Sequence, residues 1–146
     1  MHISDVLEDT HQGIVTNGFC RLPRGFAEHV DHQAVEGGTD PAYGSVEWRT
    51  LICANKTPSS GLVFGVASFH PGGCLNRHRH APAEFYFGLT GSGTVTIDGE
   101  DLRIEPGVAI YIPPNAEHGV VADGDGLSIA YGFPSDSFDA IDYEFA

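Results

Sequence analysis

Four residues with side chains able to bind metal or move protons occur as two closely spaced pairs. His78 and His80 are separated by one residue, and Glu84 and Tyr86 follow with the same spacing after Ala81-Pro82. Because alternate side chains of a strand point to one face, each pair projects in a single direction. The Ala-Pro step lets the chain turn between the pairs. The stretch therefore predicts two imidazoles and a carboxylate side by side, with a phenol next to them.

A third imidazole comes from a distant part of the chain. His118 follows the turn sequence Pro113-Pro114-Asn115 at the start of another expected strand. Three His and one Glu leave positions open on a six-coordinate ion, so the predicted site can bind a small acid, unlike a closed structural zinc site. The ligand types suit Fe(II), Mn(II), Co(II), Ni(II), Zn(II) or Cu(II) and do not choose among these metals.

Tyr86 is the first candidate for a catalytic residue. A phenol beside a divalent cation can ionise and act as a base, since the cation favours the charged form. The alternative is a barrel tyrosine that donates a hydrogen bond to a ligand carboxylate or to the backbone. Tyr131 is the second candidate. It alternates with small residues over 127–133, which predicts that its ring faces inward.

The elements that position these residues are expected to be short strands. The chain has 146 residues with 19 Gly and 9 Pro, and turn sequences interrupt it at short intervals. Strands are predicted at 46–53, 62–69 and 127–133, with 91–93 and 123–126 separating others. The spacing favours an all-β fold with a single antiparallel barrel or jelly roll over 46–146, and a C-terminal tail packed on it. Residues 1–45 are interpreted as an N-terminal extension, partly irregular, with a short helix at 4–12.

Charge and cysteine content narrow the partners. The formal net charge is −13, which disfavours nucleic acid and anionic membranes because phosphates would be repelled. The three cysteines have no CxxC pairing, which is typical of reduced thiols in the cytoplasm. No apolar run reaches the length of a membrane span or a secretory signal. A homodimer that covers sheet edges is also expected.

The spacing of the ligands resembles that of a known family. Gly72-x5-His78-x-His80-x3-Glu84-x6-Gly91 and Gly107-x5-Pro113-x-Asn115-x2-His118 are similar to the two motifs of the cupin superfamily of small β-barrels. Asn115 and Ala122 depart from the second motif, which usually has Gly and Asn at these positions. Neither position is a ligand in the family, and Asn tolerates the left-handed backbone of a turn. The resemblance implies a monocupin in which His78, His80, Glu84 and His118 hold the metal.

From Val46 to Tyr143 the chain further resembles the small dimethylsulfoniopropionate lyases of marine bacteria. The residues that carry this likeness include Trp48, Pro71-Gly72-Gly73, Pro82-Ala83-Glu84-x-Tyr86, Asn115-Ala116-Glu117-His118 and Phe133-Pro134-x-Asp136-x-Phe138. The resemblance implies a β-elimination that yields dimethyl sulfide and acrylate, with Tyr86 as base and Fe(II) as the first choice of metal. The substrate would be a small zwitterion or carboxylate, whose sulfonium can lie against the rings of Tyr131 or Trp48.

Two other functions fit the same barrel. A metal-dependent cupin dioxygenase uses three His and one Glu, and it would consume oxygen together with its substrate. A non-catalytic cupin that binds a small acid leaves a metal-facing tyrosine without a role. Fold alone does not decide among these functions.

Overall fold

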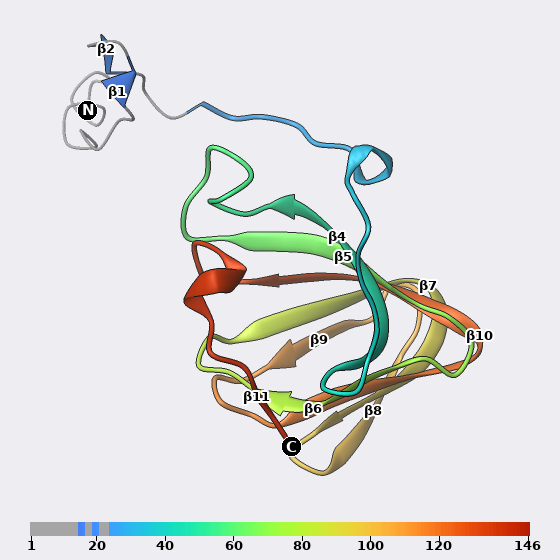
Figure 1. Cartoon of the computed structure of the whole chain (residues 1–146). Helices are drawn as coiled ribbons and strands as arrows, with labels where there is room; N and C mark the ends of the chain where they lie inside the picture. Colours follow the sequence, from blue (N-terminus) through green and yellow to red (C-terminus); the bar gives the residue numbers. More distant parts are fainter. Residues whose placement is uncertain (1–14, 17–18, 21–23) are drawn as a thin grey trace, which may run out of the picture.

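Short antiparallel strands make up most of the chain that the computed structural model describes, namely residues 15–16, 19–20 and 24–146 (Figure 1). The strands are β1 (Val15–Thr16), β2 (Phe19–Cys20), β3 (Glu36–Asp40), β4 (Gly44–Ile52), β5 (Val63–Phe69), β6 (Cys74–Arg79), β7 (Glu84–Ile97), β8 (Glu100–Ile104), β9 (Ala109–Ile112), β10 (His118–Phe133) and β11 (Glu144–Phe145). Two 3-10 turns, η1 (Val30–His32) and η2 (Phe138–Ala140), complete the elements. In these ranges, no helix has the length and apolar character needed to cross a bilayer.

Strand pairing closes the sheet into a barrel. β10 pairs with β5, β6 and β7, while β4 pairs with β5 and β6, so the order β6-β4-β5-β10 returns to β6. β8 and β9 extend the wall through their pairing with β7, and β3 extends it through β4. All of these pairs are antiparallel, which confirms the predicted all-β barrel (Figure 1).

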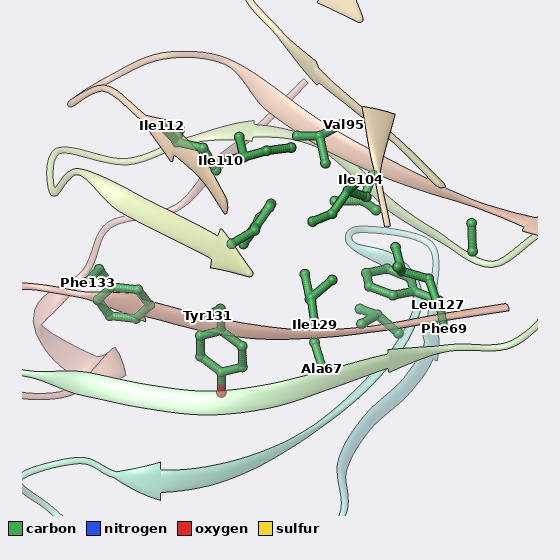
Figure 2. Close-up of a cluster of buried hydrophobic side chains, with 14 of the residues drawn as sticks. Ala67, Phe69, Val95, Ile104, Ile110, Ile112, Leu127, Ile129, Tyr131 and Phe133 are labelled. Atoms are coloured by element: carbon green, nitrogen blue, oxygen red, sulfur yellow. The ribbon is translucent and has the colours of Figure 1, made fainter. Parts of the chain in front are cut away.

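The core follows the two-residue period of the strands. On β10, Leu127, Ile129, Tyr131 and Phe133 point into the barrel, as Figure 2 shows, and each is at most 5% exposed. They pack with apolar side chains of β5, β7, β8 and β9. The inward position predicted for Tyr131 is therefore confirmed.

The prediction that the glycine-rich stretches end strands was wrong. Residues 91–93 lie within β7 and 123–126 within β10, where the pairing shifts register between Ala122 and Leu127. Gly91 and Gly126 both have positive φ, at 68° and 77°. A Cβ on Gly91 would lie 2.1 Å from the Gly126 carbonyl oxygen, so the backbones approach too closely for a side chain. Glycine here permits a bulge inside continuous strands.

The N-terminal stretch contains three strands that were not expected, β1, β2 and β3, of which β3 joins the barrel sheet. β3 pairs with β4 from Glu36↔Trp48 to Asp40↔Gly44, although Gly37 and Gly38 give it the composition of a loop. The helix predicted at 4–12 lies outside the described residues. The division of the chain at residue 46 stays a prediction.

Candidate metal centre

The three histidines and the glutamate meet inside the barrel. His78 and His80 lie at the end of β6 and just after it, Glu84 begins β7, and His118 begins β10. The antiparallel pairing His118↔His78 brings the distant imidazole beside the local ones. Their exposed fractions are only 3%, 3%, 8% and 1%, in the order of their numbers. Four buried polar side chains in one place require a common partner or a dense hydrogen-bond network.

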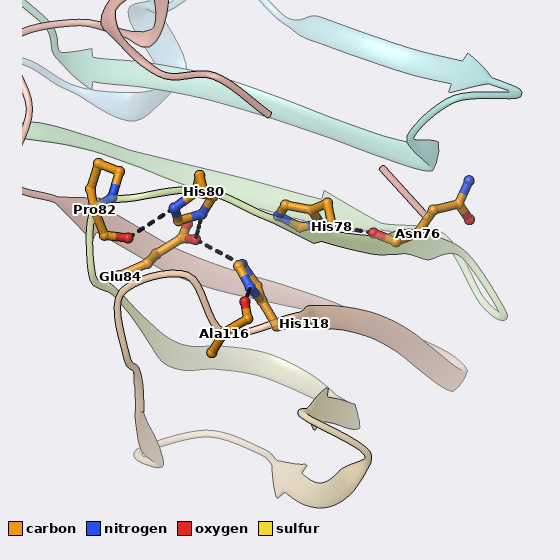
Figure 3. A network of polar contacts seen from close by, with 7 residues as sticks. All are labelled: Asn76, His78, His80, Pro82, Glu84, Ala116 and His118. Atoms are coloured by element: carbon orange, nitrogen blue, oxygen red, sulfur yellow. Dashed lines mark hydrogen bonds and ion pairs between the residues drawn. The ribbon is translucent and has the colours of Figure 1, made fainter. Parts of the chain in front are cut away.

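Backbone carbonyls fix the orientation of all three imidazoles (Figure 3). Nδ1 of His78 donates to the Asn76 carbonyl at 2.8 Å, Nδ1 of His80 to the Pro82 carbonyl at 2.9 Å, and Nδ1 of His118 to the Ala116 carbonyl at 2.9 Å. A carbonyl can only accept, so Nδ1 carries the proton in each ring. The neutral tautomer then leaves Nε2 with a lone pair, as a metal ligand requires.

The ligand atoms converge as a divalent ion requires. One ligand atom from each of His78, His80, Glu84 and His118 lies within 4.8 Å of all the others. Glu84 Oε2 is 2.9 Å from His80 Nε2 and 3.2 Å from His118 Nε2. Nδ1 already carries a proton in each ring, and a carboxylate oxygen only accepts. Without a cation, these two contacts therefore need a second proton, at Nε2, on the ring. A metal can replace that charge, so the donor set fits a divalent transition metal.

Burial and mutual contacts set the charges of the group. Burial and the neighbouring His118 lower the pKa of His78 to about 4, which keeps this ring neutral at physiological pH. Burial also acts to lower the pKa of His80, but the Glu84 contact outweighs it, so the pKa is raised. Burial acts to raise the pKa of Glu84, and the contacts with His118 and His80 together bring it below its ordinary value. Glu84 is therefore an ionised ligand.

Tyr86 and Tyr131 lie next to this group. Tyr86 is two residues beyond Glu84 on β7, and its ring centroid is 6.2 Å from that of His118. Both hydroxyls are buried and have no hydrogen-bond partner among the described residues. An unpaired buried hydroxyl costs free energy, which is a sign of a place where a ligand binds. The structure thus places Tyr86 beside His118, and it places the ring of Tyr131 in the wall of the cavity that His78 and Glu84 also line.

A cavity of about 330 Å³ opens beside the ligands. Aromatic side chains make up much of its wall, including Tyr43, Trp48, Phe133, Phe138 and Tyr143. Trp48, whose ring was expected to lie against the substrate, is half-buried and lines the cavity. Arg77 and Arg79 point outward into solvent. The cavity is large enough for a small acid and offers it an apolar, cation-tolerant surface.

Two aromatic residues of the C-terminal tail that lie against the site were not predicted from the sequence. β11 pairs with β6 through Glu144↔Arg79 and Phe145↔His78. The Tyr143 ring centroid lies 5.4 Å from that of His80, and the Phe145 ring centroid lies 5.3 Å from that of His78. The aromatic tail was expected to pack on the barrel, but its sequence carries no signal for pairing at the ligands.

Comparison with known proteins agrees with this geometry. A profile of the Cupin_2 family, described as a cupin domain, matches residues 65–131. The chain is 57% identical over 116 residues to the dimethylsulfoniopropionate lyase DddW of Ruegeria pomeroyi, a match that covers 80% of this chain and 76% of the relative.

Solved structures share the barrel at lower identity. One, of the DMSP lyases RdDddP and RnDddQII, is 22% identical with a TM-score of 0.65, and the match covers 79% of this chain and 63% of that one. The present chain thus spans less than two thirds of that protein. The polyketide cyclase RemF of Streptomyces resistomycificus is 21% identical with a TM-score of 0.70, over 84% of this chain and 87% of that one. These likenesses support the fold alone.

Proposed function

This chain belongs to the DddW family of dimethylsulfoniopropionate lyases within the cupin superfamily, and on that premise we propose that it cleaves dimethylsulfoniopropionate by β-elimination. The observation that carries the proposal is the unpaired Tyr86 hydroxyl, buried in the same cavity as His78 and Glu84. A cavity that only held a small acid would have no need of such a phenol. The family membership rests on 57% identity over most of the chain.

His78, His80, Glu84 and His118 would hold the metal. When bound, a divalent metal supplies the positive charge that attracts the substrate carboxylate and stabilises the negative charge of the transition state. Backbone carbonyls orient the three imidazoles for this role, so that each Nε2 can serve as a ligand. We propose Fe(II) as the native ion. Elemental analysis of the purified protein distinguishes it from the other transition metals.

Tyr86 would act as the base. Burial, together with the Glu84 carboxylate, holds the pKa of Tyr86 well above its ordinary range. The phenol therefore keeps its proton until positive charge in the cavity offsets Glu84. As phenolate, it would take the proton from the α-carbon of the substrate. The C–H electron pair forms the double bond of acrylate, the bond between the β-carbon and sulfur breaks, and its electrons leave with dimethyl sulfide.

The cavity wall would keep the reaction away from bulk water. Phe133 and Tyr143 lie near the ring of His80, and Tyr131 contacts Phe133 and Phe138 in the wall of the cavity. An apolar surrounding strengthens each charge contact at the reacting atoms. We propose that Tyr131 takes part through its ring, which lines the cavity, because its hydroxyl points toward Gly65 and Thr50.

Two broader features complete the proposal. We propose that the protein works in the cytoplasm, where its free thiols Cys53 and Cys74 stay reduced. We also propose a homodimer, because the side chains of Phe85, Phe87 and Tyr111 are exposed on the outer face of the barrel. Light scattering at several protein concentrations tests the dimer.

Headspace analysis tests the function. Purified, metal-loaded protein should release dimethyl sulfide and acrylate in equal amounts from dimethylsulfoniopropionate, at the same rate with and without oxygen. Release that depends on oxygen would indicate a dioxygenase. Binding of the substrate without either product would indicate a non-catalytic binding protein.

A further inference from the structure

The cavity has a second charged end. Apart from the metal-binding group, Glu36 is the one charged side chain that lines it within the part of the chain that the structure describes. Glu36 comes from β3, while Glu84 comes from β7, so the two carboxylates approach the cavity from different parts of the wall. The surfaces between them are mostly aromatic and aliphatic. A carboxylate in such a wall attracts positive charge, and Glu36 already has one cation, Lys56, as a partner.

Hydrogen bonds hold Glu36 in place. Its Oε2 accepts from the Thr50 hydroxyl at 2.7 Å and from Lys56 Nζ at 2.7 Å. Thr50 is buried, so its hydroxyl is a fixed donor. Burial acts to raise the pKa of Glu36, but the Lys56 and Thr50 contacts outweigh it and the pKa is lowered. Glu36 is therefore ionised, with one oxygen engaged and the other without a hydrogen bond to any described residue.

Tyr131 lines the same cavity as both carboxylates, with its hydroxyl near Gly65. Burial, followed by the charges of Glu36 and Glu84, raises its pKa, although the Thr50 contact acts to lower it. The rings of Trp48 and Tyr43, whose centroids are 5.8 Å apart in an edge-on arrangement, line the wall on the side of Glu36. A ligand whose carboxylate reaches the metal-binding group would extend its other end along these rings.

We propose that Glu36 determines the specificity of the cavity for ligands that carry a positive charge at the end opposite their carboxylate. This inference rests on the proposed function. The aromatic wall accepts a neutral group of the same shape, whereas the carboxylate favours only a cation. Lys56 offsets part of the Glu36 charge and so limits the preference.

Two ligands of one shape test the charge directly. 3-(Trimethylammonio)propanoate and 4,4-dimethylpentanoate differ only in a positive nitrogen in place of a carbon. Calorimetry on the metal-loaded protein gives a dissociation constant for each ligand, and acrylate analysis checks that neither is turned over. The ratio of the two constants measures the preference for the cation and cancels changes common to both ligands.

Two substitutions in one ion pair should act in opposite directions. Glu36→Gln keeps an acceptor for Thr50 and should reduce the preference for the cation roughly three- to ten-fold, with little change for the neutral ligand. Lys56→Gln removes the offsetting charge and should increase the preference. Glu47→Gln is the matched control, because Glu47 lies next to Trp48 on β4 but does not line the cavity.

Opposite shifts cannot come from loss of the ion pair as a structural contact, since both variants break it. An unchanged ratio in Glu36→Gln, or a shift in the same direction in both variants, would overturn the role of Glu36. The proposed function fails separately, if the wild-type protein binds both ligands but releases no dimethyl sulfide from dimethylsulfoniopropionate.

Discussion

Tyr86 and Tyr131 are direct partners across β7 and β10, and both hydroxyls are buried without a hydrogen bond to any described residue. Burial raises the pKa of Tyr86 most, followed by the Glu84 carboxylate, and Tyr131 adds a smaller contribution. Tyr86 lies on the side of His118, whereas the hydroxyl of Tyr131 points toward Gly65 and Thr50. A cation bound by the three histidines and Glu84 would therefore favour ionisation of Tyr86 over ionisation of Tyr131.

Removal of His118 should empty the metal site. Loss of a residue that only orients a ligand weakens metal binding roughly 10- to 100-fold. His118→Ala removes a ligand itself, so it should weaken metal binding at least as much, and turnover should disappear. The barrel should stay folded, because the strands that carry the site keep their pairing. Elemental analysis and circular dichroism measure both results. His70→Ala, an exposed histidine, is the control, and full metal content in His118→Ala would exclude His118 as a ligand.

The metal-free protein should lose stability in acid partly through His78. Its pKa in the folded chain is lowered from 6.5 to about 4, so the unfolded chain binds a proton more readily between these values. The contribution of His78 is therefore complete above pH 6.5 and falls away toward pH 4, by roughly 2–3 kcal/mol. His80, whose pKa is raised, acts in the opposite sense, and its contribution is lost as pH rises through its folded pKa.

Urea unfolding at pH 7 and pH 4.5 checks this effect. The loss of unfolding free energy between the two pH values should be larger in the metal-free wild-type protein than in His78→Gln. Other acidic groups titrate in both proteins, so the difference isolates His78. Equal losses would show that the ring is protonated as easily in the folded chain as in the unfolded one.

Shortening the tail should separate packing from cavity closure. Truncation after Asp136 removes Phe138 and the buried Ile141, and should lower the melting temperature by roughly 10 °C. Truncation after Asp142 keeps both but removes Tyr143 and β11, so it should change the melting temperature less and raise KM by opening the cavity. Melting curves and steady-state kinetics test the pair. Unchanged curves for both would mean that the tail contributes no packing.

Asn115 should be replaceable by glycine but not by alanine. Its φ is 62°, in the left-handed region that Asn and Gly tolerate. Asn115→Gly should leave the free energy of unfolding nearly unchanged, whereas Asn115→Ala should lower it by about 1 kcal/mol. Urea unfolding measures both. A larger loss in the glycine variant would mean that the Asn side chain, and not the backbone, stabilises the turn.

The local part of the site could be predicted from sequence because a strand has a fixed period. His78 and His80 on one face, and Glu84 and Tyr86 on the next strand, follow from alternation and one turn. His118 followed from motif spacing, since periodicity does not say which strands pair. The nitrogen and oxygen ligands suit several ions, so the sequence specifies a divalent transition metal rather than one element.

The missed residues depend on long-range pairing. β11 pairs with β6 although roughly sixty residues separate the two strands in the sequence, and nothing in the composition of the tail specifies that register. Glu36 stands beside two glycines of positive φ, which give β3 the appearance of a loop. Its place in the cavity depends on pairing with β4, a tertiary contact that overrides local propensity.

The kcat of Tyr86→Phe tests the central claim most directly. The substitution keeps the ring and removes the hydroxyl, so metal content and KM should change little while dimethyl sulfide release falls roughly 10²-fold or more. Tyr131→Phe, which removes the neighbouring phenol, is the matched control and should retain more activity. A kcat near that of the wild-type protein in Tyr86→Phe would contradict the assignment, and a large loss in Tyr131→Phe alone would transfer the role of base to Tyr131.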